Sequence, residues 1–169
     1  VTNEKVNHTV MPAFFLLNMA SWPAEKLEKY DLSSLRHAGA FGISIPYSVW
    51  KMIRDRWKIT GIKLYASCEV GIGTTCSDVS SEKLGESEDK RKSTTIGFPA
   101  PGTLIRIIDS KGREVKSGEI GELVIKAQDK FSGYLGQPEK TAEKPKEGWV
   151  YTGDMVSRDE DGYIYMEGK

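Results

Sequence analysis

The sequence carries no net charge and has few residues of the kinds that bind transition metals. Lysine plus arginine number 24, as do aspartate plus glutamate, so the 169-residue chain has a formal net charge of zero. Nucleic acids call for a cationic surface that neutralises phosphates, so this composition argues against a nucleic-acid partner. The two cysteines and two histidines form no paired C-x-x-C spacing, which argues against a zinc site. We expect reduced thiols in a cytoplasmic protein.

Long apolar runs are also missing. The most apolar stretch, Val10–Met19, is too short to cross a bilayer, which takes about 20 apolar residues. No basic segment precedes it, and this argues against a signal peptide. The chain opens on Val1 rather than on a methionine, and we expect it to be the middle part of a longer protein. Its length fits one domain or two small subdomains, and its oligomeric state cannot be derived from the residues.

The first half of the chain alternates between helical and strand patterns. Ala13–Ala20 is apolar on nearly all sides, which fits a buried helix or a strand, and its Leu and Met residues favour the helix. Ser33–Ala40 predicts a strand that runs into a glycine turn at Gly39 and Gly42.

A helix and a further strand complete the pattern of a βαβ unit. Apolar residues recur at helical spacing with charged residues on the other side, at Ile45, Val49, Ile53 and Trp57. We expect this amphipathic helix to have Ser44 as its N-cap and to end at Gly61. Ile62–Ala66 predicts a short buried strand. Strand, helix and strand in this order predict a parallel sheet.

The second half has a β texture and follows a polar segment, Ser80–Lys92. That segment is mixed in charge and free of aromatics, so we expect a mobile surface loop, with a binding role for its charges as the alternative. Leu104–Ile108 and Tyr163–Met166 predict strands, and the turns before and between the later strands are expected at 109–112 and 159–162. Leu123, Ile125 and Ala127 alternate with polar residues, as in a half-buried strand.

The fold class that these patterns predict is α/β. A partial parallel βαβ subdomain over residues 1–92 would be followed by a small antiparallel β-barrel subdomain over residues 93–169.

Three short blocks could carry chemistry, and each also has a plain structural interpretation. Ala38–Gly42 places small residues where a planar ring could approach the backbone, or simply forms a tight turn. Tyr65–Glu69 follows a parallel strand, and ligands bind at the carboxyl ends of such strands. Its Glu69 could hold a metal ion or be a surface carboxylate. Asp154 could accept from two hydroxyls at once or cap a turn.

Taken together and in order, these blocks resemble the acyl-adenylate-forming superfamily, which includes acyl-CoA synthetases, aryl-CoA ligases, luciferases and peptide-synthetase adenylation domains. The resemblance runs along essentially the whole chain, through Tyr30–Arg36, Tyr65–Glu69, Ile96–Gly102, Gly118–Leu123, Gly133–Thr141, Trp149–Asp154 and Gly162–Lys169. The last block matches the run into the family's interdomain hinge.

The resemblance implies an AMP-forming acid–thiol ligase with ATP, Mg²⁺ and coenzyme A. Such enzymes join a carboxylic acid to AMP, release pyrophosphate and pass the acyl group to a thiol. The mixed anhydride supplies the leaving group that a carboxylate lacks, and the protein must hold ATP and the acid in line. A ligase for fatty or aryl acids, as in fatty acid metabolism, is the leading interpretation. The alternatives are an adenylation enzyme that loads a carrier-protein thiol, or a non-catalytic nucleotide-binding module of the same fold.

The resemblance also assigns roles to individual residues. Ala38, Gly39 and Ala40 would line one side of adenine, and Tyr65 would pack against its other face. Asp154 would accept hydrogen bonds from the ribose hydroxyls, with packing and turn-capping roles as the plain alternatives for Tyr65 and Asp154.

Two catalytic candidates follow Tyr65. Glu69 would bind Mg²⁺, a hard cation that prefers oxygen ligands and neutralises the phosphates. Cys68 replaces a Thr whose hydroxyl contacts the α-phosphate in the family. Because a thiol is a weaker donor, that contact is in question, and a covalent role for Cys68 is the alternative.

Further departures and gaps limit what the resemblance implies. Ala66 replaces a Gly, and Lys169 stands where an Arg often contacts the nucleotide, which keeps the charge but loses the fork. Gly42, Gly71 and Ile72 would line part of the acyl pocket, although the acid itself cannot be named. The triphosphate-gripping loop would lie upstream of the chain and the thiol-receiving domain downstream, so we expect this chain to be inactive alone.

Overall fold

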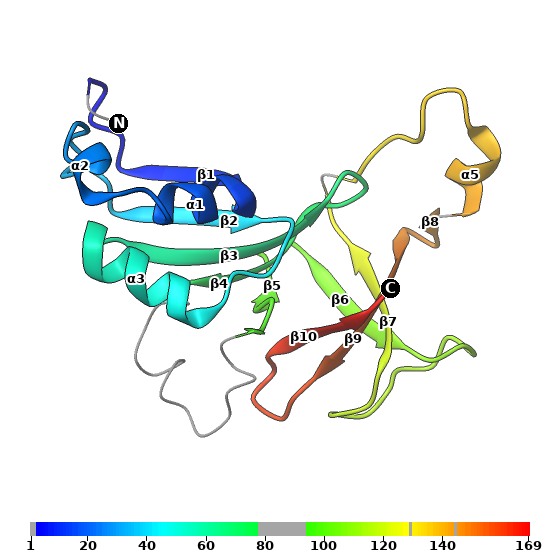
Figure 1. Ribbon diagram of the computed structural model, residues 1–169. Helices are drawn as coiled ribbons and strands as arrows, with labels where there is room; N and C mark the ends of the chain where they lie inside the picture. Colours follow the sequence, from blue (N-terminus) through cyan, green and yellow to red (C-terminus); the bar gives the residue numbers. More distant parts are fainter. Residues whose placement is uncertain (1–2, 78–93, 129, 144) are drawn as a thin grey trace. The chain divides into compact units, whose positions relative to one another are not determined.

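The computed structural model describes residues 3–77, 94–128, 130–143 and 145–169 (Figure 1). These residues form two compact units. Of the described residues, 3–64, 76–77 and 94 belong to the first unit, and 65–75, 95–128, 130–143 and 145–169 belong to the second. The predicted loop Ser80–Lys92 and the predicted subdomain boundary between residues 92 and 93 lie outside the described residues.

The elements alternate between helix and strand in the first half of the chain and are mainly strands in the second. In chain order they are β1 (His8–Pro12), α1 (Ala13–Ala20), α2 (Ala24–Leu27), β2 (His37–Phe41), α3 (Tyr47–Trp57), β3 (Thr60–Ser67), β4 (Gly71–Ser77), β5 (Phe98–Pro99), β6 (Leu104–Ile108), β7 (Gly121–Lys126), α5 (Pro138–Glu143), β8 (Pro145–Lys146), β9 (Trp149–Arg158) and β10 (Ile164–Gly168). The strands form two sheets, in the orders β1-β2-β3-β4-β5 and β10-β9-β7-β6, with β8 beside β9.

The first unit contains the predicted βαβ pattern. Strands β1, β2 and β3 pair in parallel, and α3 connects β2 to β3. Helix α1 has the predicted bounds and contacts α3 (Figure 1). It is not buried all round, since Phe14 and Phe15 are 56% and 52% exposed. The predicted α/β class with a parallel subdomain is confirmed.

Strand β2 begins later than predicted, and the predicted turn at Gly39 is wrong. Gly39 lies inside the strand, opposite Val10 on β1 and Ile62 on β3. A Cβ at Gly39 would lie 3.0 Å from Val10 Cγ2 and 3.4 Å from Leu64 Cδ1. Glycine here therefore serves close packing within the sheet rather than a change of direction. The change of direction comes at Gly42, whose φ is +99°.

The ends of helix α3 also differ from the prediction. Pro46 occupies the N-cap position and no side chain caps the helix, so the predicted cap at Ser44 is wrong. Proline suits this place because the first N–H groups of a helix have no partner within it. The helix ends before Lys58, which has a left-handed φ of 55°. Gly61 does not end it, because Gly61 already pairs with Ala38 in the sheet.

The second unit contains a curled four-stranded antiparallel sheet that forms half of a barrel (Figure 1). Strand β6 has the predicted bounds, and Leu123 and Ile125 on β7 are both 0% exposed, as the alternation predicted. Its core is formed by buried aliphatic residues from several strands: Val70, Ile96, Ile107, Leu123, Ile125, Val150, Val156 and Ile164. The predicted turns at 109–112 and 159–162 are present, each closed by a glycine N–H donating to an aspartate carbonyl.

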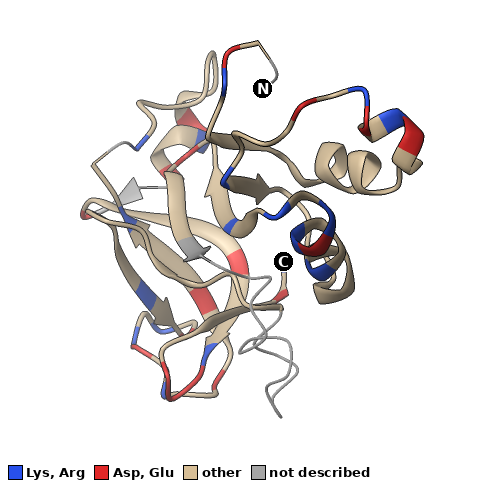
Figure 2. Ribbon diagram, turned by 90° about the vertical axis from the view of Figure 1, so that its left-hand side faces the viewer, with Lys and Arg blue, Asp and Glu red and all other residues tan. Residues whose placement is uncertain are grey.

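Charged residues of both signs are interspersed along the described chain (Figure 2). Several form ion pairs: Lys51 with Asp55 at 2.9 Å, Arg113 with Asp109 at 2.7 Å and Arg106 with Glu114 at 3.1 Å. None of the helices within the described residues combines the length and the apolar character needed to cross a membrane.

Candidate functional site

Tyr65, Asp154 and Lys169 meet in the second unit, although they are far apart in the sequence. The Tyr65 hydroxyl, near the end of β3, donates a hydrogen bond of 2.7 Å to Asp154 Oδ2 on β9. Lys169 Nζ lies 3.6 Å from Asp154 Oδ1, and the Asp154 side chain is only 14% exposed. Burial, followed by the hydrogen bond to Asp154, raises the pKa of Tyr65 well above its ordinary value. The hydroxyl therefore stays protonated and remains a donor at neutral pH.

A β-bulge aims Asp154 at this cluster. Glu122 pairs with Met155 and Val124 with Tyr151, so Leu123 of β7 faces three residues of β9, Thr152 to Asp154. Thr152 Oγ1 donates to the Leu123 carbonyl at 2.7 Å and accepts from the Asp154 N–H at 3.1 Å. Bulges commonly redirect side chains beside functional sites, and this one turns Asp154 out of the plain alternation of the strand.

Gly153, at the centre of the bulge, has a φ of +78°, a conformation that glycine adopts without a steric cost. Its N–H donates to Glu122 Oε1 at 3.1 Å. Each residue of the Thr152-Gly153-Asp154 triplet thus has a local structural role. Thr152 bonds the bulge to β7, Gly153 adopts the positive φ of the bulge, and the bulge orients the Asp154 side chain.

The Tyr65 ring packs against the barrel core in space that Gly73 leaves open. A Cβ at Gly73 would lie 3.1 Å from Tyr65 Cδ1 and 2.8 Å from Ile125 Cδ1, so the absent side chain leaves room for the ring. Tyr65 is half-buried and contacts the core cluster. The two sequence interpretations of Tyr65 therefore coexist, because packing fixes the ring while the hydroxyl reaches Asp154.

Glu69 lies in the turn after β3 and accepts two hydrogen bonds from a loop that is distant in the sequence. The Phe131 N–H donates to the Glu69 carbonyl at 3.0 Å, and the Tyr134 hydroxyl donates to Glu69 Oε1 at 2.5 Å. Cys68, its neighbour, is exposed and its thiol is free of disulfide bonding. The sequence predicted no role for Tyr134. Its place in the Gly-Tyr-Leu block was the available signal, but the block does not reveal which carboxylate the tyrosine reaches.

Glu69 is the residue of this set whose chemistry suits a cation. Within the described residues, no three His, Cys, Asp or Glu side chains gather as a metal-binding group. Mg²⁺ commonly takes one or two protein carboxylates and completes its shell with water and substrate phosphates. A lone carboxylate such as Glu69 therefore fits a metal that arrives with a nucleotide better than a metal that stays in the protein.

The other predicted residues are divided between the two units. In the first unit, Ala38, Gly39 and Ala40 form the buried middle of β2, and Ala38 and Ala40 are 0% and 2% exposed. In the second unit, Gly71 has a φ of +62°, and Ile72 is 48% exposed. Ile72 lines a cavity of about 310 Å³ together with Val70, Ala100, Pro101, Gly102, Thr103, Ala127 and Gln128.

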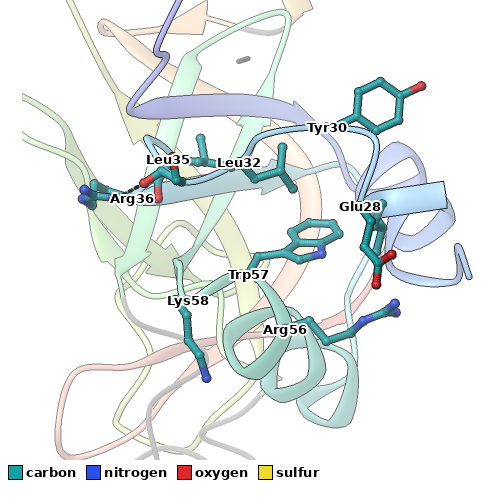
Figure 3. Close-up of a pocket in the computed structure, with 10 residues that line it drawn as sticks. Glu28, Tyr30, Leu32, Leu35, Arg36, Arg56, Trp57 and Lys58 are labelled. Carbon is teal, nitrogen blue, oxygen red and sulfur yellow. Dashed lines mark hydrogen bonds between the residues drawn. The ribbon is translucent and has the colours of Figure 1, made fainter. Parts of the chain in front are cut away.

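A different pocket, of about 480 Å³, lies in the first unit (Figure 3). Figure 3 shows Trp57 and Leu32 facing each other across it, with Tyr30 pointing outward. Two cationic side chains that line the pocket bond to backbone carbonyls of the protein. The Arg36 guanidinium donates to the carbonyls of Ser33 and Leu35. The Arg56 guanidinium donates to those of Ala20 and Trp22. The pocket lies where α3 ends and β2 begins, away from the carboxyl ends of the parallel strands at which ligands bind.

Comparisons with known proteins find relatives over the whole chain. Residues 1–135 match the model of a protein family described as AMP-binding enzyme. The chain is 32% identical over 142 residues to a long-chain-fatty-acid–CoA ligase of Salmonella typhimurium, a match that covers 83% of this chain and 24% of that protein. It is 31% identical over 172 residues to the pyochelin synthase PchD of Pseudomonas aeruginosa, covering 100% of this chain and 29% of that protein.

A solved structure also aligns with nearly the whole chain. The amide bond synthetase McbA from Marinactinospora thermotolerans aligns with a TM-score of 0.82 at 27% identity, covering 99% of this chain and 32% of that one. The chain thus spans between 24% and 32% of the length of these three relatives.

Proposed function

The chain belongs to the AMP-binding enzyme family, and from this we propose that it is the nucleotide-binding middle part of an acid–thiol ligase. The complete protein would use ATP to activate a fatty or aryl carboxylate as an acyl-adenylate and would transfer the acyl group to coenzyme A. A long-chain fatty acid is the substrate to test first, because the long-chain-fatty-acid–CoA ligase of Salmonella typhimurium is one of the relatives. A cytoplasmic location and inactivity of the 169-residue chain on its own belong to the same proposal.

The observation that carries the proposal is the meeting of Tyr65, Asp154 and Lys169 in one unit. Asp154 is a nearly buried carboxylate that already accepts from the Tyr65 hydroxyl at 2.7 Å and lies 3.6 Å from the Lys169 ammonium. A carboxylate has about four lone-pair sites, so Asp154 can also accept from a pair of ribose hydroxyls. The aromatic ring of Tyr65, fixed against the core, would offer its remaining surface to a purine.

The role proposed for Glu69 is to bind the Mg²⁺ that accompanies ATP. Bound there, Mg²⁺ would neutralise phosphate charge while a carboxylate oxygen of the acid forms a bond to the α-phosphorus and pyrophosphate leaves. Cys68 precedes Glu69 and is exposed, so its thiol is available as a weak donor to a phosphate oxygen. Ala38, Gly39 and Ala40 remain the proposed adenine-side residues, with Gly42, Gly71 and Ile72 on the side of the acyl group.

The thiol proposed to accept the acyl group is that of coenzyme A. Coenzyme A is favoured because a CoA ligase is among the relatives, and a carrier-protein thiol is the alternative. A non-catalytic module is the third candidate. It would bind the nucleotide without forming AMP, so separate measurements of binding, AMP and acyl-CoA distinguish all three.

The test is a panel of fatty and aryl acids given to the full-length protein that contains this chain, with AMP and acyl-CoA followed separately. We expect acid-dependent AMP formation that falls at least tenfold in Glu69→Gln, because loss of even an outer-shell partner of a metal ligand typically costs about 10–100-fold. Glu114→Gln is the matched control, since Glu114 is an exposed carboxylate paired with Arg106 at 3.1 Å. ATP binding without AMP formation for any acid would reject the ligase proposal, and equal rates in both variants would reject the role of Glu69.

A further inference from the structure

We propose that Tyr134 is a positioning residue that orients the Glu69 carboxylate, and that the segment Phe131–Thr141, a loop that runs into helix α5, is shaped to deliver its hydroxyl. The inference rests on the proposed function, because it takes Glu69 to be the residue that meets the Mg²⁺ of ATP. It adds a second residue to that role, from a segment 65 positions further along the chain.

The loop reaches Glu69 at two points. The Phe131 N–H donates to the Glu69 carbonyl at 3.0 Å, which fixes the backbone of the turn. The Tyr134 hydroxyl donates to Glu69 Oε1 at 2.5 Å, which fixes the side chain. Two attachments from one short loop restrain both the position and the rotamer of the carboxylate. A short bond to an ionised oxygen belongs to the stronger class of hydrogen bonds.

The loop is held in shape by Thr141. The Tyr134 N–H donates to Thr141 Oγ1 at 2.8 Å, and the same hydroxyl donates to the Gln137 carbonyl at 2.9 Å. Gly133, with a φ of +145°, lies so close to Thr141 that a Cβ would be 2.6 Å from its methyl carbon. The glycine, the tyrosine and the threonine of this block therefore act together: the threonine closes the loop, the glycine lets it approach, and the tyrosine points out of it.

Tyr134 is also fixed by its ring and stays protonated. Its ring makes an edge-to-face contact with Phe131, with the ring centroids 5.0 Å apart. A phenol hydroxyl is protonated in the neutral range, so the Tyr134 hydroxyl is available as a donor to Glu69. A carboxylate can accept such a donor and coordinate a hard cation at the same time, because each oxygen has more than one lone-pair site.

Hydrogen-bond partners that orient a metal ligand affect the affinity of the site for the metal. A carboxylate that is already oriented loses less conformational freedom on coordination, which raises its affinity for the cation. Loss of the hydroxyl should therefore lower the affinity of the site for Mg²⁺. Loss of a residue that only stabilises the fold would lower the amount of active protein without changing that affinity.

The experiment compares Tyr134→Phe with Tyr165→Phe in the full-length protein. Tyr165 is the matched control, because its hydroxyl also donates to a carboxylate, Asp159 Oδ2, at 2.7 Å. The first readout is binding of radiolabelled ATP by equilibrium dialysis over a series of Mg²⁺ concentrations. The second is the Mg²⁺ concentration for half-maximal acid-dependent pyrophosphate exchange, with the melting temperature of each variant measured alongside.

We expect Tyr134→Phe to raise the half-saturating Mg²⁺ concentration about tenfold in both readouts, with KM for the acid unchanged. Tyr165→Phe should leave the half-saturating Mg²⁺ concentration unchanged, even if it lowers the melting temperature as much as Tyr134→Phe does. The inference is overturned if Tyr134→Phe has the Mg²⁺ dependence of the unsubstituted protein while Glu69→Gln is impaired. If Glu69→Gln itself shows normal Mg²⁺ dependence, the proposed role of Glu69 fails, and this inference fails with it.

Discussion

At the scale of single residues, the site depends on a hydroxyl that links strand β3 to strand β9. The sequence made Tyr65 and Asp154 candidates, each with a plain structural alternative. What it could not indicate is that the tyrosine donates directly to the aspartate at 2.7 Å. Such a contact depends on the β-bulge at Thr152–Asp154, and a bulge changes which way a side chain points without leaving a periodic signal in the sequence.

Tyr65→Phe removes that hydroxyl while keeping the ring against the core. We expect the free energy of unfolding of the 169-residue chain to fall by about 1.5–3 kcal/mol, because a nearly buried carboxylate loses a hydrogen-bond donor. Urea denaturation measures the change. Tyr30→Phe serves as the control, because Tyr30 is 50% exposed and the change there should stay within about 0.5 kcal/mol. Equal effects of the two substitutions would mean that the Tyr65–Asp154 contact contributes no stability.

The roles of Gly39 and Tyr134 could not be predicted from the sequence alone. Gly39 was expected to turn the chain, but its role is to let β1 and β3 side chains approach β2. A glycine signals missing side-chain volume, and the sequence alone does not tell whether the backbone or a neighbour uses that space. Tyr134 was part of a recognised block and was still given no function, because its partner, Glu69, is 65 positions away.

At the scale of elements, patterns in the sequence predicted half of the strands and helices of the described residues, and β1, α2, β4, β5, α5, β8 and β9 were not predicted. Strand β6 and helix α1 have the predicted bounds, and the parallel β2–α3–β3 unit was expected from its order. These elements carry strong local signals, which are alternation of apolar residues in strands and helical spacing in helices. The ends of helix α3 were predicted less well. Pro46 begins α3 in place of Ser44, and Lys58 ends it in a left-handed conformation that non-glycine residues seldom adopt.

The pairing of β6 with β7 provides a prediction at this scale. Gly121 opens β7, and a Cβ there would lie 2.6 Å from the Ile108 carbonyl oxygen and 3.0 Å from Ile107 Cγ2. Backbone atoms cannot move aside as side chains can, so we expect Gly121→Ala to lower the free energy of unfolding by about 1–3 kcal/mol. Thermal or urea unfolding of the 169-residue chain would measure this.

Gly168→Ala is the control for that substitution. Gly168 lies on β10, and a Cβ there would meet nothing within 4 Å. The steric account of β7 is wrong if alanine is tolerated equally at both positions. If only Gly121→Ala destabilises the chain, the close approach of β6 to β7 is the cause.

At the scale of the whole molecule, the chain consists of two compact units, and the contacts of the candidate site described above are made within the second. Tyr65, Glu69, Tyr134, Asp154 and Lys169 all belong to that unit, although Tyr65 and Glu69 come directly after the first. The sequence indicated two subdomains and the order of their textures. It could not indicate that residues 65–75 join the second unit, because membership in a unit is decided by packing, as where Tyr65 lies against the barrel core.

Asp154 gives the most direct test of the central claim, that these residues form the binding site of a nucleotide. The measurement is equilibrium dialysis of ATP with Mg²⁺ against the full-length protein, comparing Asp154→Asn with Asp159→Asn. Both aspartates accept a tyrosine hydroxyl at 2.7 Å, so the two substitutions are matched in kind. Charge-assisted hydrogen bonds contribute about 1.5–3 kcal/mol, so we expect Asp154→Asn to weaken ATP binding about tenfold or more and Asp159→Asn to leave it unchanged. Unchanged ATP affinity in folded Asp154→Asn protein would contradict the assignment of the site.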